Sequence, residues 1–179
     1  MNHLAHAWIA VRTETSIVGN LLGDFVKGRP EAAYGGELLR GIRTHRAVDA
    51  FVDSHPAFLR SRARLPGALR RWSGILVDLG YDHALATRWD ELGQGTLRAF
   101  ADRVYAELRA AHAELPLRMR GFVEYMTSTD LLAAYREPAG VARALDGMSK
   151  RMRRENPLGS AAADLLRAVP GIETDLDAR

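Results

Sequence analysis

The sequence predicts an all-α protein that folds as a single compact helical domain over residues 1–179. Apolar residues recur every three or four positions, as at Leu97, Phe100, Val104 and Leu108, which is the period of a helix. No stretch alternates apolar and polar residues as a half-buried strand does. The chain also has the length of one domain, and it contains no repeat, low-complexity tract or long linker. We therefore expect a series of helices that share one core.

Capping and helix-breaking residues divide the chain into segments. The hydroxyls of Thr15 and Ser16 can accept hydrogen bonds from the amides of a first turn, and Pro56 suits a first turn because that position needs no amide proton. The expected segments run from Thr15 and Ser16 to Gly28, from 37 to 53 after Gly35-Gly36, over a short helix from Pro56, from Pro66-Gly67 to about Trp89, from Thr96 to before Pro116, and over 118–127, 130–136, 138–154 and 160–168. From Pro170 onward the chain is polar and acidic, and we expect it to lie at the surface or to fray.

The absence of cysteine restricts the possible chemistry. It excludes a disulfide, a thiolate zinc site, an iron–sulfur cluster and a cysteine nucleophile, so any metal must be held by His, Asp, Glu or Asn. The start of the chain lacks the basic region of a signal peptide, and no apolar run reaches the roughly 18 residues of a membrane span. We expect a soluble, cytoplasmic protein with no membrane contact. A net charge of +3 is too small to indicate nucleic-acid binding.

Histidine, carboxylate and amide side chains recur at helical spacing in four places. Residues three or four apart share a helix face, which pairs His3 with His6, Asn20 with Asp24, His45 with Asp49, and Asp78 with Asp82, next to His83. One such pair alone is more often a surface ion pair or a cap than a metal site. However, Asp24 and Asp78 lie in apolar stretches, where a buried carboxylate needs a cation or hydrogen bonds to compensate its burial. The four pairs together favour a bound metal.

The metal and its chemistry follow from these ligand types. Imidazole and carboxylate ligands suit Mn²⁺, Fe²⁺, Zn²⁺ or Mg²⁺. Such a centre lowers the pKa of bound water toward roughly 7 and polarises a phosphoryl oxygen, which indicates a hydrolytic site. The sequence has no phosphate-binding glycine loop after a strand and no serine in a nucleophile-elbow setting.

Two stretches are rich in basic residues. The first contains Arg60, Arg62, Arg64, Arg70 and Arg71, and the second contains Lys150, Arg151, Arg153 and Arg154. The simpler interpretation of each stretch is a solvated helix face. The functional interpretation is a docking surface for an acidic partner or a clamp for phosphate. Aromatic residues are sparse beside both stretches, which disfavours a nucleic-acid groove.

Four motifs together resemble the acyl carrier protein phosphodiesterase family. They are MNHLAH at residues 1–6, GNLLGDFVKG at 19–28, GIRTHRAVD at 41–49 and DLGYDH at 78–83, followed by similar stretches at 131–136 and 146–149. The resemblance implies a helical fold distantly related to the HD-domain metal phosphohydrolases. It also implies manganese-dependent hydrolysis of the phosphodiester that joins 4′-phosphopantetheine to a serine of holo-acyl carrier protein.

The resemblance also assigns roles to individual residues. It implies one or two Mn²⁺ ions, with Mg²⁺ or Fe²⁺ as substitutes, held by a subset of Asp24, His45, Asp49, Asp78 and Asp82. Asp24, Asp82 or His83 would carry the catalytic proton transfer, with His6 and Asn20 as supporting residues behind the ligands. Because acyl carrier proteins are acidic, the basic residues expected to contact the carrier or its phosphate are Arg46, Arg70, Arg71, Lys150, Arg151 and Arg153.

Two other functions remain open from the sequence. The same metal chemistry could act on a nucleotide or another small phosphodiester. Alternatively, the chain could be a non-enzymatic helical protein that binds an acidic partner, with the Asp and His side chains serving only the fold.

Overall fold

The computed structural model describes residues 3–178, and within that range every regular element is a helix. The longer helices are α1 (His3–Arg12), α3 (Gly36–Ser54), α5 (Ser73–Thr87), α7 (Leu97–Ala110), α8 (Leu117–Ser128), α10 (Pro138–Arg151) and α11 (Ala162–Asp177). The shorter α-helices are α2 (Ile17–Leu22), α4 (Pro56–Ala63), α6 (Trp89–Leu92) and α9 (Leu131–Ala134). The 3₁₀ helices are η1 (Gly23–Phe25), η2 (Pro30–Ala32), η3 (Gly67–Trp72), η4 (His112–Glu114) and η5 (Leu158–Ser160). The predicted all-α class is confirmed.

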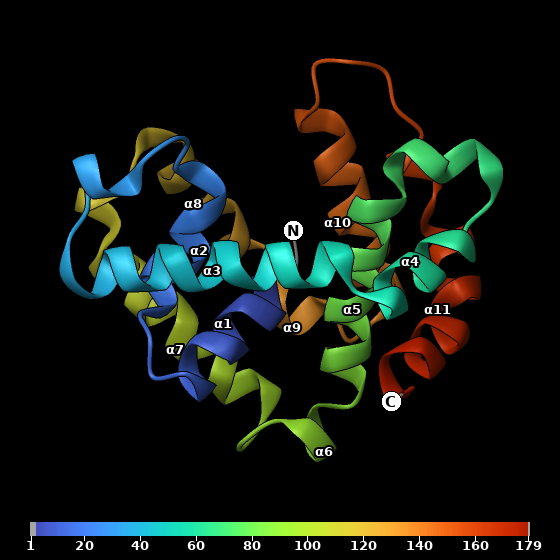
Figure 1. Ribbon diagram of the computed structural model, residues 1–179, viewed down its shortest axis with the longest axis horizontal. Helices are drawn as coiled ribbons and strands as arrows, with labels where there is room; N and C mark the ends of the chain where they lie inside the picture. Colours follow the sequence, from blue (N-terminus) through green and yellow to red (C-terminus); the bar gives the residue numbers. More distant parts are fainter. Residues whose placement is uncertain (1–2, 179) are drawn as a thin grey trace.

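Helix α3 crosses the molecule and connects its two ends (Figure 1). Helices α2, α7 and α8 lie toward one end of α3, and α4, α5, α10 and α11 lie toward the other (Figure 1). Helix α1 packs against α2, α3 and α5. The amino-terminal helix therefore lies where the two groups of helices meet. Met1 and Asn2 of the first sequence motif lie outside the described residues.

The helical periodicity and the caps of the sequence correspond to the structure. Leu97, Phe100, Val104 and Leu108 are all buried on the inner face of α7. The hydroxyl of Thr96 accepts a hydrogen bond from the amide of Ala99 at 3.1 Å, so Thr96 caps α7 as expected. Likewise, the Ser16 hydroxyl accepts from the amide of Gly19 at 2.9 Å and caps α2.

Helices α2 and α3 approach each other closely at two glycines. A Cβ at Gly19 would lie 2.6 Å from the carbonyl oxygen of Leu38, and a Cβ at Gly41 would lie 2.8 Å from the backbone of Gly19. Neither position has room for a side chain, because carbon contacts normally begin at about 3.5 Å. The two glycines thus set the position of α3 relative to α2 and to η1, which follows α2.

Several predicted boundaries differ in the structure. The segment expected from Pro66-Gly67 to Trp89 is divided into η3, α5 and α6, and the segment after Ser16 changes from α-helix to 3₁₀ helix at Gly23. The last predicted helix extends beyond its expected end at residue 168, since α11 continues to Asp177. None of the helices described is long and apolar enough to cross a membrane.

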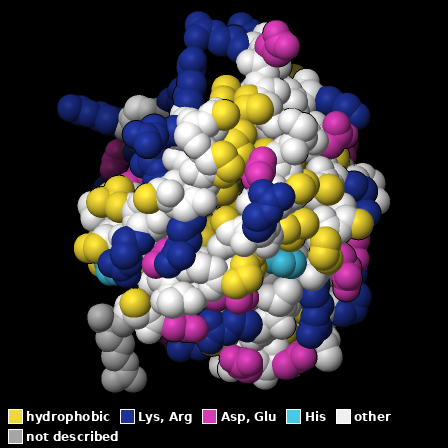
Figure 2. All heavy atoms as spheres, turned by 90° about the vertical axis from the view of Figure 1, so that its right-hand side faces the viewer, with side chains coloured by type: hydrophobic (Ala, Val, Ile, Leu, Met, Phe, Trp, Pro, Cys, Tyr) yellow, Lys and Arg dark blue, Asp and Glu magenta, His cyan; other side chains and the backbone are white. Residues whose placement is uncertain are grey.

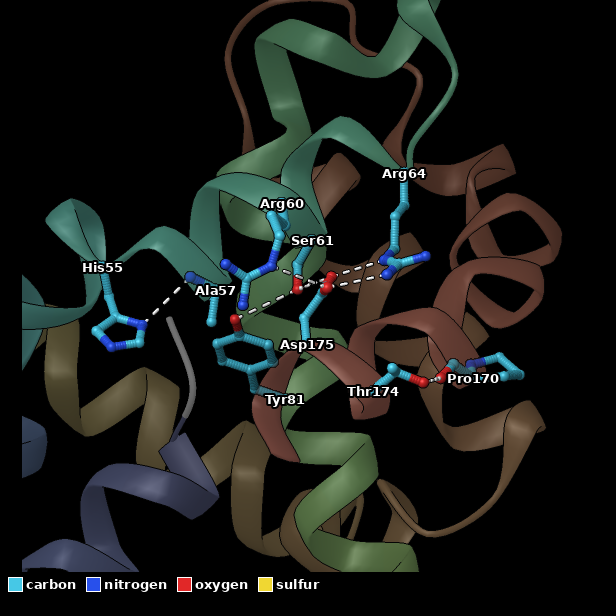
Figure 3. A network of polar contacts seen from close by, with 9 residues as sticks. All are labelled: His55, Ala57, Arg60, Ser61, Arg64, Tyr81, Pro170, Thr174 and Asp175. Carbon is cyan, nitrogen blue, oxygen red and sulfur yellow. Dashed lines mark hydrogen bonds and ion pairs between the residues drawn. The ribbon is translucent and has the colours of Figure 1, made fainter. Parts of the chain in front are cut away.

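The chain from Pro170 onward was expected to lie at the surface or to fray; it does not fray, and it is exposed only in part. Helix α11 continues through Pro170, and both Ile172 and Asp175 beyond it are buried. The Asp175 carboxylate accepts hydrogen bonds from Arg64 at 2.6 and 2.9 Å, and others from Ser61 and Arg60 (Figure 3). These contacts attach the last turns of α11 to α4 and compensate for the backbone hydrogen bond that proline cannot donate.

Candidate metal centre

Two histidines and an aspartate from α1 and α3 meet at one point. His6 Nε2 lies 3.1 Å from Asp49 Oδ1, and His45 Nε2 lies 3.0 Å from Asp49 Oδ2. One ligand atom from each residue lies within 4.8 Å of the others. The two imidazole rings stack with their centroids 3.9 Å apart. His45 and Asp49 share a face of α3, as their spacing predicts, and α1 brings His6 to them.

Asp24 on η1 forms a second side of this cluster. Its Oδ1 lies 3.6 Å from His45 Nε2, and its Oδ2 lies 3.8 Å from His3 Nδ1. Within residues 3–178, Asp24 Oδ2 and the Nδ1 atoms of His3, His6 and His45 are buried without a hydrogen-bond partner. A buried carboxylate oxygen without a donor is costly unless a cation lies nearby. The donor set therefore fits a divalent metal, with neutral imidazole and carboxylate as ligands.

The electrostatics of the cluster suit cation binding. Burial holds the pKa of His3 well below its usual range, so its imidazole is neutral. Burial also raises the pKa of Asp24, partly offset by the neighbouring His45. At Asp49, burial opposes ionisation, but hydrogen bonds from His45 and His6 outweigh it and hold the pKa of this carboxyl well below normal. Asp49, whose side chain is 51% exposed, therefore carries a negative charge beside His6 and His45.

Two further residues position the cluster. A Cβ at Gly23 would lie only 2.4 Å from Cγ and Cδ2 of His45, so glycine at this position makes room for the imidazole. The Arg46 guanidinium donates hydrogen bonds to the carbonyls of Val26 and Gly28 at 2.9 and 2.8 Å. Arg46 thus anchors the loop that follows Asp24 to α3. Arg46, which was predicted to contact the carrier or its phosphate, also holds this loop.

Asp82 caps α1, the helix that carries His3 and His6. Its Oδ2 accepts the amide proton of Leu4 at 3.0 Å and its Oδ1 accepts that of Ala5 at 2.9 Å, and the side chain is fully buried. Burial raises the pKa of Asp82 to about 7, although the two hydrogen bonds from Leu4 and Ala5 act to lower it. Each carboxylate oxygen thus accepts one hydrogen bond from the first turn of the helix that carries His3 and His6. In this geometry Asp82 positions the first turn of α1, and its predicted role as a ligand or a catalytic group stays a prediction.

Two other predicted residues, His83 and Asn20, contact groups other than His6, His45, Asp49 and Asp24, and their predicted roles stay predictions. His83 Nδ1 lies 2.7 Å from the carbonyl oxygen of Tyr135, in a buried position. The amide of Asn20 donates to Thr15 Oγ1 and to the carbonyl of Ser16, both at 2.9 Å, and so holds the start of α2. Burial raises the pKa of Asp78, which lies on α5 one turn before Asp82.

The structure brings to the cluster two residues that were not among the predicted ligands. His6, expected behind the ligands, contacts Asp49 directly. His3 was not proposed as a site residue, although its spacing from His6 predicted a shared face, and the structure places it beside Asp24. That shared face is the signal in the sequence that could have identified His3.

Several of the predicted basic contact residues are exposed. Arg70, Arg71, Arg151 and Arg153 are open to solvent, whereas Lys150 forms an ion pair with Asp146 at 2.7 Å. Figure 2 shows Lys and Arg side chains spread over one face of the molecule, with several projecting at its upper edge among apolar and acidic groups. In the first basic stretch, Arg60 and Arg64 donate hydrogen bonds to Asp175 (Figure 3). Arg62 donates to Ser73.

A pocket of about 400 Å³ adjoins the cluster, with His3 and Asp24 in its wall. Phe122 on α8 forms another part of the wall and lies 4.6 Å from the His3 ring, centroid to centroid. Arg118 and Arg151 also line the pocket, and the Arg151 guanidinium lies 4.7 Å from the centre of the Tyr125 ring. The sequence contains no signal for this pocket, because its walls come from distant segments.

Comparison with known proteins gives a consistent family. The family model described as acyl carrier protein phosphodiesterase matches residues 1–178. A protein of that name from Photorhabdus laumondii subsp. laumondii is 32% identical over 166 residues, covering 92% of this chain and 84% of the relative. Another protein of that name, from Pectobacterium atrosepticum, is 34% identical over 166 residues, covering 92% of this chain and 86% of the relative. A third, from Yersinia pestis, is 36% identical over 152 residues, covering 84% of this chain and 79% of the relative. No solved structure matches significantly, so the likeness to HD-domain proteins stays a prediction.

Proposed function

Because the chain belongs to the acyl carrier protein phosphodiesterase family, we propose that it hydrolyses the phosphodiester of holo-acyl carrier protein. Water would attack the phosphorus, and the bond between phosphorus and the serine oxygen of the carrier would break. The products are apo-carrier protein and free 4′-phosphopantetheine. Membership in a family of enzymes sets aside the non-enzymatic alternative.

The observation that carries this proposal is the convergence of His6, His45, Asp49 and Asp24. Four side chains from three elements point their nitrogen and oxygen atoms at one another, and a buried oxygen of Asp24 has no hydrogen-bond donor among the described residues. We propose that they hold one or two Mn²⁺ ions, for which Mg²⁺ or Fe²⁺ could substitute. A bound ion would supply positive charge for the phosphoryl oxygens and lower the pKa of a coordinated water.

The protein side chains would perform the remaining tasks. Asp24 lines both the cluster and the adjoining pocket, so its carboxylate lies where it would accept a proton from the attacking water. His3 is neutral and stays beside Asp24, where it adds no competing charge. Asp82 fixes the first turn of α1 and thereby the positions of His3 and His6. Exposed arginines such as Arg151 would attract the acidic carrier.

Intact-mass spectrometry of a carrier protein tests this proposal. Purified enzyme with Mn²⁺ should lower the mass of holo-acyl carrier protein by one 4′-phosphopantetheine group. Asp49→Asn should reduce both Mn²⁺ affinity and turnover, by roughly 10²-fold or more, since it removes the central negative charge of the cluster. His112→Ala is the matched control, because His112 lies in η4 and pairs with Glu124 outside the cluster.

The assay also separates the alternatives. An unchanged carrier mass with rapid hydrolysis of a small phosphodiester such as bis(p-nitrophenyl) phosphate would favour the small-substrate enzyme. Full turnover by Asp49→Asn would show that the cluster of His6, His45 and Asp49 is not the centre of the reaction.

A further inference from the structure

The pocket beside Asp24 opens from the candidate metal centre into an apolar space. Its walls combine side chains from η1, α5, α8 and α10, chiefly Phe25, Ile75, Phe122, Met148 and Met152. Its volume of about 400 Å³ lies in the range of about 300–1,000 Å³ that is typical of small-molecule sites. Because His3 and Asp24 belong to its wall, a group bound at Asp24 would lie at the edge of this space.

The lining of the pocket suits a slender, mostly apolar chain with a few polar groups. Two methionines offer flexible, adaptable surface, and the aromatic ring of Phe122 packs against both His3 and Phe25. Polar atoms are few in this lining, and the charged side chains are Asp24, Arg118 and Arg151. Arg118 is exposed and forms no ion pair with any residue in the described part of the chain. An uncharged chain attached to a phosphate would suit this pocket, because the chain would lie against the apolar wall and the phosphate near the charged side chains.

We infer that this pocket binds the pantetheine arm of the substrate while the phosphodiester lies at Asp24. This inference rests on the proposed function and deepens it. The arm is an uncharged chain of two amides and a gem-dimethyl group that begins at the phosphate, so it can extend from the metal centre along the apolar wall. The enzyme thereby recognises the prosthetic group itself, in addition to the acidic surface of its carrier.

Gly121 on α8 allows the pocket to be filled without disturbing the fold. Gly121 lines the pocket, and a Cβ built on it has no atom within 4 Å. It lies inside a helix, where Ala, Leu and Trp all have higher helix propensity than glycine. We therefore compare Gly121→Leu and Gly121→Trp with the matched control Gly121→Ala. The thermal unfolding midpoint checks that each variant is folded.

The first measurement is binding of pantetheine and of 4′-phosphopantetheine by calorimetry, without metal and without turnover. Pantetheine lacks the phosphate, so it reports on the pocket alone. Gly121→Trp should weaken both affinities by roughly ten- to hundredfold, Gly121→Leu by less, and Gly121→Ala by little, because the loss grows with the volume placed in the pocket. Wild-type affinity in a folded Gly121→Trp variant, or no pantetheine binding by the wild type, would overturn the inference.

Kinetics separate failure of this inference from failure of the proposed function. Gly121→Trp should raise KM for holo-acyl carrier protein by a larger factor than KM for bis(p-nitrophenyl) phosphate, which lacks the arm. A wild-type protein that binds pantetheine but leaves the carrier mass unchanged would refute the proposed reaction and retain the pocket. A protein that cleaves the carrier equally well with Trp or Gly at position 121 would retain the reaction and refute the pocket.

Discussion

Replacing Gly23 with alanine should displace His45 and impair the metal centre. The backbone at Gly23 has φ −51° and ψ −36°, which alanine adopts without strain, so the effect comes only from the added methyl group. That methyl would lie 2.4 Å from Cγ and Cδ2 of His45 and 2.8 Å from its Cβ. Carbon atoms in contact stay about 3.5–4.0 Å apart, so the imidazole or the whole of η1 must move by about 1 Å.

The expected magnitudes follow from that displacement. Forcing one methyl group into a packed site costs about 1–3 kcal/mol of stability. A misplacement of about 1 Å at a catalytic centre lowers the rate by about 10²-fold. The movement also changes the distances of His45 Nε2 to Asp24 and Asp49, now 3.6 and 3.0 Å, so Mn²⁺ affinity should fall as well.

Gly74→Ala provides the matched control for this substitution. Gly74 lies in the first turn of α5, and no atom lies within 4 Å of a Cβ built there. Urea unfolding, Mn²⁺ calorimetry and turnover of holo-acyl carrier protein should all distinguish the two variants. If Gly23→Ala binds Mn²⁺ and turns over the carrier as Gly74→Ala does, the contact with His45 does not constrain the site and the reasoning is refuted.

Two further predictions concern residues that hold the fold around the site. Asp82→Ala leaves the amides of Leu4 and Ala5 without an acceptor. Urea unfolding should therefore show a loss of about 2–5 kcal/mol in the free energy of unfolding, and Mn²⁺ affinity should fall as well. A variant as stable as the wild type would contradict the capping role. Asp175→Asn tests the pH dependence of stability. Hydrogen bonds from Arg64 lower the pKa of Asp175 from 3.8 to about 2, although burial acts in the opposite direction. The stabilisation by this carboxylate is therefore complete above about pH 4 and is lost as the pH falls through about 2. Acid unfolding followed by circular dichroism should be less steep for the variant, and identical acid limbs would exclude this contribution.

Local sequence patterns were sufficient to predict the helices and part of the site. A period of three to four residues depends only on the geometry of a single helix, so the buried face of α7 and the pairing of His45 with Asp49 follow from spacing. Hydroxyl caps such as Thr96 act within one turn and are equally local. The apolar stretch around Asp24 likewise predicted that this carboxylate would be partly buried.

Contacts between distant segments could not be predicted in this way. The C-terminal turns after Pro170 look polar and free in the sequence, yet Asp175 is buried by arginines 111 and 115 residues away. Asp82 and His83 follow the spacing of metal ligands, but the fold directs Asp82 at the first turn of α1 and His83 at a backbone carbonyl. Spacing defines the face of a helix on which a side chain lies, and packing between helices decides what that face meets.

The sequence by itself determined the all-α class, the caps, and an inventory of histidines and carboxylates without cysteine, all of which depend on residue chemistry and on contacts within one or two turns. Only the tertiary structure decided which members of that inventory meet. The close approach of α2 and α3 at Gly19 and Gly41, and the capping of α1 by Asp82, bring His6, His45, Asp49 and Asp24 to one point. These contacts join segments tens of residues apart, and their geometry arises only when the helices share a core.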